Sequence, residues 1–135
     1  MTSFKDVLKE ALVVGGFDCG HHLVFSKWIP SGENMGQVEI NTLEEFRHHY
    51  NGGTYFLDLE NVTIYGADEL PFFVSYLCLT LTLSDGKWTG DVYTEKEELP
   101  HGYEKDMSKL EERRRRVTEK LLSVVRLLSA LATAT

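Results

Sequence analysis

The sequence predicts an α+β domain in which a curved antiparallel sheet of four to six strands packs its apolar face against a long C-terminal helix. Three observations lead to this prediction. Residues 106–132 have helical periodicity, residues 73–94 alternate as a β-hairpin does, and two shorter helical stretches lie nearer the N-terminus. A chain of 135 residues can build one core, so we expect a single domain over residues 1–135.

The C-terminal helix is expected to begin at a capping box formed by Ser108 and Glu111. Its apolar stripe is Leu110, Val117, Leu121, Val124, Leu128 and Leu131, with Leu127 on one flank and Val125 and Ala132 on the other. This arc covers close to half of the helix, which is more than one sheet face usually needs. We therefore expect either deep burial or contact with a second subunit as well as with the sheet.

Basic side chains gather on the same helix. Lys109, Arg113, Arg116 and Lys120 fall on one face, and Arg114 lies at the edge of the apolar arc. Like charges stacked in this way repel by a few tenths of a kcal/mol per pair. The compensating anion could be this chain's own acidic body, an acidic partner or a phosphate. The alternative is a solvated helix face, with Arg113 and Arg114 paired to Asp58, Glu60 or residues 95–98.

Charge is distributed unevenly along the chain. The net charge is −7, with six Lys and Arg against sixteen Asp and Glu in residues 1–100 (−10) and eight against five in residues 101–135 (+3). An acidic body disfavours binding to long nucleic acid, which needs a basic footprint. Two cysteines are too few for a disulfide framework, and neither an export signal nor a membrane-spanning run is visible. We expect a cytoplasmic protein.

The N-terminal half predicts two short helices and a hairpin. Ser3 caps a first helix, which buries Phe4, Val7, Leu8, Ala11 and Leu12 and ends at Gly15 and Gly16. Residues 17–20 read as a loop, and residues 23–29 and 37–41 as a pair of strands. A capping box at Thr42 and Glu45 opens a second helix with Leu43, Phe46 and Tyr50 inward, ended by residues 51–53.

The central strands are read from alternation. Residues 55–64 change phase near Asn61, which predicts a bulge or break there, and residues 66–71 read as a loop. Asp85-Gly86 is a hairpin turn that sets Ser84 opposite Lys87 and Leu81 opposite Gly90, where room is left for the C-terminal helix or a ligand. Residues 77–83 carry no charge, so we expect a central strand or a dimer contact, followed by an acidic loop at 95–100.

No pattern of catalytic residues stands out. His21-His22 and His48-His49 lack the spacing of a metal site, and Cys19 beside His21 lacks a motif that would orient a catalytic pair. Asp58 and Glu60 share one face of a strand, but solvated acids are far commoner there than acid–base pairs. Phosphate-binding and hydrolase motifs are absent from the sequence. We expect no enzyme activity, no cofactor and no metal.

The first functional prediction is a non-enzymatic binding protein that associates stoichiometrically with a protein partner, as a homodimer through the C-terminal helix. The wide apolar arc, the split charge and the missing catalytic motifs favour it. Small acidic α+β chains of this kind occur among secretion chaperones, toxin-immunity proteins and inhibitors of host defence. This is an analogy of class with no motif behind it.

The second prediction is a small-molecule binder that sequesters or senses an anionic nucleotide, cyclic or linear, as a phage-encoded antagonist of host defence would. Lys109, Arg113, Arg114, Arg116 and Lys120 would hold phosphate. The stacking candidates are Phe73, Trp88 and Tyr93. A weaker third prediction is a metalloenzyme that uses the histidines.

Overall fold

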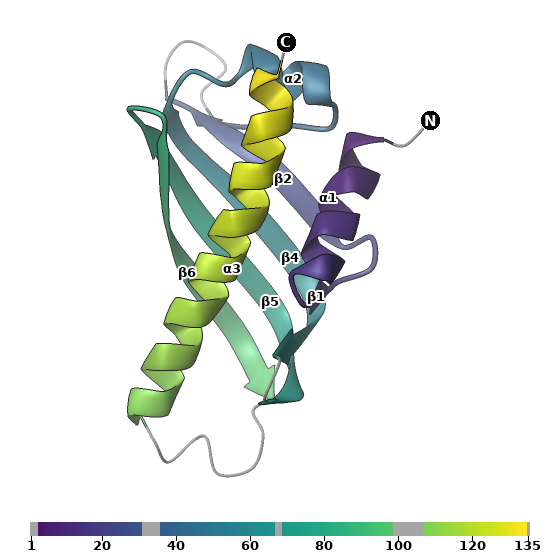
Figure 1. Ribbon diagram of the computed structural model, residues 1–135, viewed down its shortest axis with the longest axis vertical. Helices are drawn as coiled ribbons and strands as arrows, with labels where there is room; N and C mark the ends of the chain where they lie inside the picture. The colour runs from purple at the N-terminus through teal and green to yellow at the C-terminus, as the bar shows by residue number, and fades with distance from the viewer. Residues whose placement is uncertain (1–2, 31–35, 67–68, 99–106, 135) are drawn as a thin grey trace.

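Three helices pack against one face of a six-stranded antiparallel sheet in the computed structural model of the chain (Figure 1). The structure describes residues 3–30, 36–66, 69–98 and 107–134, without the side chains of residues 66, 69–72, 98 and 107–110. The strand order is β3-β2-β4-β5-β6, and β1 pairs with β4 beside this path. The predicted α+β class is confirmed.

The first helix forms as the sequence predicts. Helix α1 (Phe4–Val14) is capped by the Ser3 side chain, which accepts a hydrogen bond from the Asp6 N–H, and Gly15 ends it. Gly16 follows with a φ of 96°, and a Cβ there would come within 2.4 Å of the Tyr65 carbonyl oxygen. Only glycine permits this approach, which lets β1 (Phe17–Asp18) pair with β4 where a loop was predicted.

The next elements also match, apart from one helix end. Strands β2 (Leu23–Ile29) and β3 (Gly36–Glu39) form the predicted hairpin. Helix α2 (Leu43–His48) begins at Thr42, whose side chain accepts from the Glu45 N–H. It ends at His49 rather than at the glycines, because Gly52 and Gly53 instead use positive φ angles to enter β4 (Gly53–Gly66).

Strands β5 (Glu69–Ser84) and β6 (Lys87–Glu98) are longer than predicted. The hairpin register is the expected one, with Ser84 opposite Lys87 and Leu81 opposite Gly90. The loops predicted at 66–71 and 95–100 are wrong for their described parts, because residues 69–71 and 95–98 continue the ladder. Residues 77–83 lie in an interior strand, as predicted.

A bend across β4, β5 and β6 explains why the alternation of apolar residues did not predict the full length of these strands. Asn61 in β4 and Lys96 in β6 have φ angles of 52° and 54°, and the ladder continues in register on both sides of them. Leu59 and Val62 are both buried although three positions apart, and so are Val74 and Leu77. The phase change predicted at Asn61 is thus confirmed, and it curves the sheet around the last helix (Figure 1).

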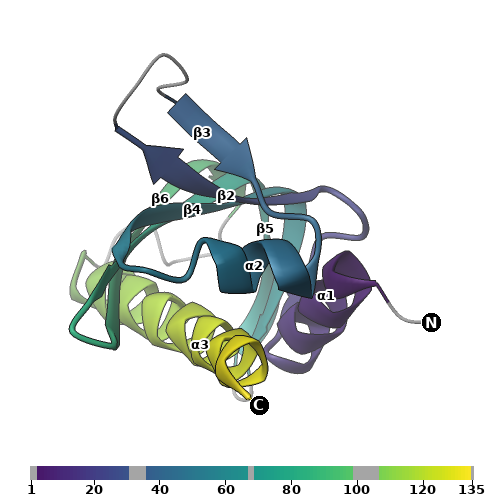
Figure 2. The same cartoon turned by 90° about the horizontal axis from the view of Figure 1, so that it is seen from above.

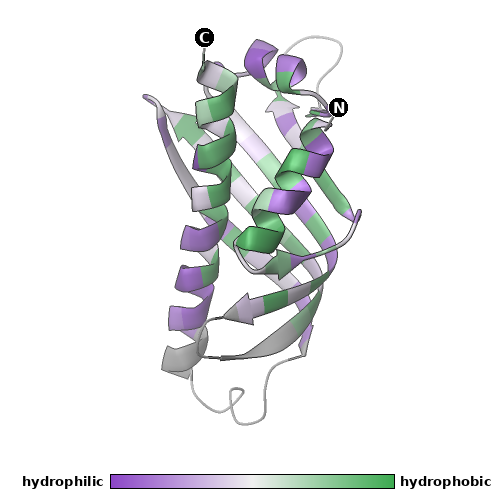
Figure 3. Ribbon diagram, turned by 45° about the vertical axis from the view of Figure 1, so that its right-hand side comes forward, coloured by the Kyte–Doolittle hydropathy of each residue, from purple (hydrophilic) through white to green (hydrophobic). Residues whose placement is uncertain are grey.

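Helix α3 (Met107–Thr133) crosses the concave face of the sheet. Its hydrophilic N-terminal half gives way to a hydrophobic C-terminal half (Figure 3). The buried arc is rotated from the predicted one, because it gains Leu122 while Leu127 and Leu131 remain 55% and 41% exposed. A Cβ on Gly90 would lie 3.4 Å from the Leu122 side chain, so the room left at Gly90 is filled by the helix. The other buried apolar residues of α3 are Val117, Leu121, Val124, Val125, Leu128 and Ala132.

All three helices lie on the concave side, as the view from above shows (Figure 2). Phe4, Phe25 and Phe46 form an aromatic group that joins α1, β2 and α2. None of the described helices covers the other side of the sheet. The two faces of the sheet therefore have different environments: the concave face is buried beneath the helices, and the other face is in contact with solvent.

Candidate functional site

We call the uncovered side of the sheet the open face, and its side chains form regular rows across the strands. One row runs through Ser26, Phe56, Thr80 and Asp91, and the next through Val24, Asp58, Cys78 and Tyr93. A third contains Glu60, Tyr76 and Glu95. Because successive residues of a strand point to opposite faces, these positions lie away from the buried leucines. Glu39 and Trp28 extend the open face on the β2–β3 hairpin.

Aromatic and acidic side chains meet in the middle of the open face. The Tyr76 hydroxyl donates to Asp58 Oδ1, and its ring lies 6.4 Å from that of Tyr93. The Tyr93 hydroxyl in turn donates to Glu95 Oε1 at 2.8 Å. Tyr93 is 56% exposed, so this group presents an aromatic surface beside carboxylates.

The two groups that contact Asp58 are held in their neutral forms. Burial, followed by the hydrogen bond to Asp58, raises the pKa of Tyr76 far above its usual value, so the phenol remains a donor. Burial and the charge of Asp58 also raise the pKa of the Cys78 thiol. A thiol held in its neutral form is a weak nucleophile.

An apolar flank adjoins this group on β2 and β4. Trp28 and Val24 are 40% and 38% exposed, and Phe56 is half-buried. Ser26 lies between Val24 and Trp28 along β2 and is only 2% exposed. Large side chains already shelter this part of the open face, so a partner here would gain apolar contact.

The predicted phosphate-binding residues do not form one surface. Arg113 is 5% exposed and occupies the buried side of α3, one turn before Val117. Arg114, Arg116 and Lys120 are exposed, whereas the side chain of Lys109 lies outside the described residues. The proposed stripe is therefore divided between the core and solvent.

The stacking candidates are likewise separated. Trp88 is 4% exposed on the concave face, where its Nε1–H donates to the Ser129 hydroxyl at 2.7 Å. Tyr93 lies on the open face, and half-buried Phe73 lies beyond the bend. These rings do not converge on Arg114. Nucleotide binding by the remaining basic residues stays a prediction.

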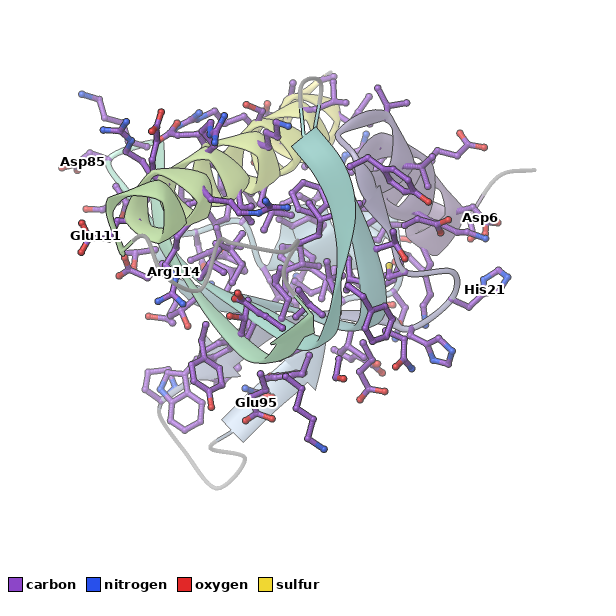
Figure 4. All side chains as sticks on the ribbon, turned by 90° about the horizontal axis from the view of Figure 1, so that it is seen from below. Asp6, His21, Asp85, Glu95, Glu111 and Arg114 are labelled. Atoms are coloured by element: carbon purple, nitrogen blue, oxygen red, sulfur yellow. The ribbon has the colours of Figure 1, made fainter. Side chains whose placement is uncertain are left out.

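Arg114 lines a cavity of about 450 Å³ between α3 and the edge of β6. The β6 lining is Gly90, Asp91 and Val92, and the α3 lining is Glu111, Arg114, Arg115, Thr118 and Glu119. Figure 4 shows Glu111 and Arg114 on the side of the sheet opposite Glu95. Carboxylates and guanidinium groups alternate around this cavity, which suits a mixed-charge surface better than a bare phosphate.

The histidine pairs lie at opposite ends of β2. The His22 carbonyl accepts from Glu60 near the start of the strand, whereas the His49 carbonyl contacts Lys27 near its end. Within the described residues, no group of three or more His, Cys, Asp and Glu side chains could hold a metal ion. Cys19 is 3% exposed, and burial together with Asp18 raises the pKa of its thiol.

Lys27 is a buried cation that the sequence reading passed over. It is 6% exposed, and its ammonium donates to the His49 carbonyl at 2.8 Å and to the Asn51 side-chain oxygen. It lies 5.1 Å from the centre of the Tyr55 ring, and burial lowers its pKa. The sequence did contain a signal for this burial: Leu23, Phe25 and Lys27 alternate along the strand, so all three point to the same, inward face. Its contacts fasten the turn after α2 to the sheet.

No family model, curated protein or solved structure matches the chain. Among the described residues, no helix is long and apolar enough to cross a membrane.

Proposed function

We propose that the chain is a non-enzymatic binding protein whose open face holds a basic segment of a protein partner in a stoichiometric complex. The observation that carries this proposal is the exposed group of Tyr93, Tyr76 and neighbouring carboxylates on a sheet face that no described helix covers. Inhibitor, immunity and chaperone roles all act through such an association.

Cation recognition follows from the chemistry of this surface. A Lys or Arg side chain over an exposed tyrosine ring gains about 0.5–1 kcal/mol, and more when it is desolvated. Asp91 and Glu95 flank Tyr93 two positions away on β6, and Glu60 lies in the row of Tyr76 and Glu95. All three carboxylates are exposed. An arginine could stack on the ring while its fork pairs with a carboxylate.

Two further features support a protein partner over a small ligand. The open face extends over several strands, and Trp28, Val24 and Phe56 add partly exposed apolar surface to it. The net charge of −10 in residues 1–100 would steer a cationic partner toward the sheet.

The test is affinity capture with a matched pair of triple variants. The open-face variant carries Glu60→Gln, Tyr93→Ala and Glu95→Gln. The control carries Glu10→Gln, Glu44→Gln and Leu127→Ala, which change the charge equally and truncate a side chain of similar exposure on the helical side. Each tagged chain is expressed in its source cells, and captured proteins are quantified by mass spectrometry.

We expect a basic protein in equimolar amount with the wild type and the control, and at least a tenfold loss with the open-face variant. Raising the salt concentration should release it, because exposed charge pairs are screened. Equal capture by both variants, or a captured partner without a basic segment, would contradict the proposal. Far-UV circular dichroism verifies that both variants are folded.

A further inference from the structure

The outer edge of β6 is a second region, besides the open face, where another chain could bind. This strand ends the sheet, and in the described residues no other strand pairs with it on that side. Alternate N–H and C=O groups of an edge strand point outward and can pair with another chain. Between Lys87 and the bend at Lys96, the edge carries only two charged side chains besides Lys87, at Asp91 and Glu95.

We infer that a second copy of this chain pairs along the β6 edge, so that two sheets join into one across a twofold axis. This inference is independent of the proposed partner on the open face. The dimer interface was expected on α3, and this inference places it on β6 instead. Most of the apolar arc of α3 is already buried against its own sheet. The exposed pair Leu127 and Leu131 is small beside the roughly 800 Å² that each partner of a stable complex buries.

Charge complementarity identifies a second copy as the occupant. The charged side chains of α3 at the cavity beside β6 are Arg114 and Arg115 together with Glu111 and Glu119. In a twofold interface the same patch faces itself, so each arginine can meet a carboxylate of the other copy. A patch of one sign would repel itself, whereas this mixed patch is self-complementary.

The strand itself sets the position of the axis. In the joined sheet the buried faces of both copies must lie on the same side. Each inward-facing residue of β6 must therefore pair with an inward-facing residue of the other copy, and each outward-facing residue with an outward-facing one. An axis through Asp91 would oppose two aspartates, and an axis through Tyr93 would oppose Asp91 and Glu95. An axis through Val92 avoids both and sets Asp91 beside Tyr93 of the second copy.

The cavity leaves space for this pairing. It lies on the concave side of the edge, under the turns of α3 that contain Arg114 and Thr118. Its volume of about 450 Å³ gives room for the inward-facing side chains along an added strand. On the open side, the two aromatic groups around Tyr93 would become neighbours.

A charge-swap experiment tests the interface. One variant carries Arg114→Glu and Arg115→Glu, and a second carries Glu111→Arg and Glu119→Arg. We expect native mass spectrometry of the wild type to give twice the chain mass of 15.4 kDa at micromolar concentration, each variant alone to give a monomer, and their mixture to restore a dimer. The control variant Arg116→Glu with Lys120→Glu lies on exposed positions outside the cavity lining and should remain dimeric.

Hydrogen exchange locates the contact on the strand. Backbone amides of residues 88–94 should exchange at least tenfold more slowly in the wild-type dimer than in either charge variant alone. A monomeric wild type, a dimer that survives both charge variants, or unchanged exchange in β6 would each overturn the inference. Capture of a basic partner by a monomer would leave the proposed function standing.

Discussion

The two faces of this sheet share the same strands yet differ in what their side chains can do. On the concave face, Leu57, Leu79 and Leu81 are completely buried beneath the helices. On the open face, their neighbours along the strands include Asp58 and Thr80, and Tyr93 follows the buried Val92 on β6. These three side chains remain in contact with solvent. The burial of apolar side chains, which stabilises the fold, is therefore concentrated on the first face.

The largest expected effect is the difference in unfolding free energy between substitutions at two neighbouring residues of β5 that point to opposite faces. Leu79→Ala should lower the free energy of unfolding by about 3 kcal/mol, because it leaves a cavity in the core. Thr80→Ala should change it by less than about 0.5 kcal/mol, because Thr80 is exposed. Urea unfolding followed by circular dichroism measures both values. Similar losses at the two positions would contradict the difference between the faces.

Alkaline pH should weaken the concave face through Tyr55. Burial raises the pKa of this fully buried phenol from 10.0 to about 12. A folded pKa above the unfolded one gives stability that is complete below pH 10 and is lost as the pH rises to about 12, by about 2–3 kcal/mol. The pKa of Lys27 is lowered by burial, so its contribution rises with pH up to 10.5 and is constant above that, where most of the Tyr55 loss occurs.

The variant Tyr55→Phe separates the two contributions. It loses the hydrogen bond from the Tyr55 hydroxyl to the His49 carbonyl at 2.6 Å, which should cost about 1 kcal/mol at neutral pH. Its unfolding free energy should then fall less than that of the wild type between pH 10 and pH 12. Parallel pH curves for the two proteins would show that Tyr55 titrates normally.

A smaller effect is expected at Gly90, which lies beneath Leu122 of α3. In Gly90→Ala, the added Cβ would lie 3.1 Å from both the Leu79 side chain and the Thr80 carbonyl oxygen. The backbone contact cannot relax easily, so we expect a loss of about 1–2 kcal/mol. Thermal unfolding measures it, and Gly86→Ala at the open hairpin turn is a control for strain without a steric clash.

The smallest effect on folding is expected at Arg114. This side chain is exposed at the cavity beside β6, so Arg114→Ala should change the free energy of unfolding by less than about 0.5 kcal/mol. If the protein binds a nucleotide through α3, the same variant should weaken that binding at least tenfold. Equilibrium dialysis with a labelled cyclic dinucleotide measures it, and unchanged binding would remove Arg114 from any phosphate site.

Local sequence patterns determined most of the elements. Side-chain caps at Ser3 and Thr42 placed the helix starts, and Asp85-Gly86 fixed the register of the long hairpin. These signals are short-range, since each depends on a few neighbouring residues and on the backbone geometry they prefer. The phase change at Asn61 was visible for the same reason, but the bulge predicted with it is not found there: the register with β5 is the same on both sides of Asn61 and shifts only between Ile64 and Gly66.

Only the tertiary structure decided which surfaces remain available. Arg113 looked like a surface cation but is buried, because the final rotation of α3 depends on how all of its apolar residues fit the curved sheet. Tyr76, Tyr93 and Asp58 come from three strands, and their meeting depends on pairing between residues far apart in the chain. A single sequence carries the periodicity of each strand, whereas the sum of the packing contacts fixes which faces are covered.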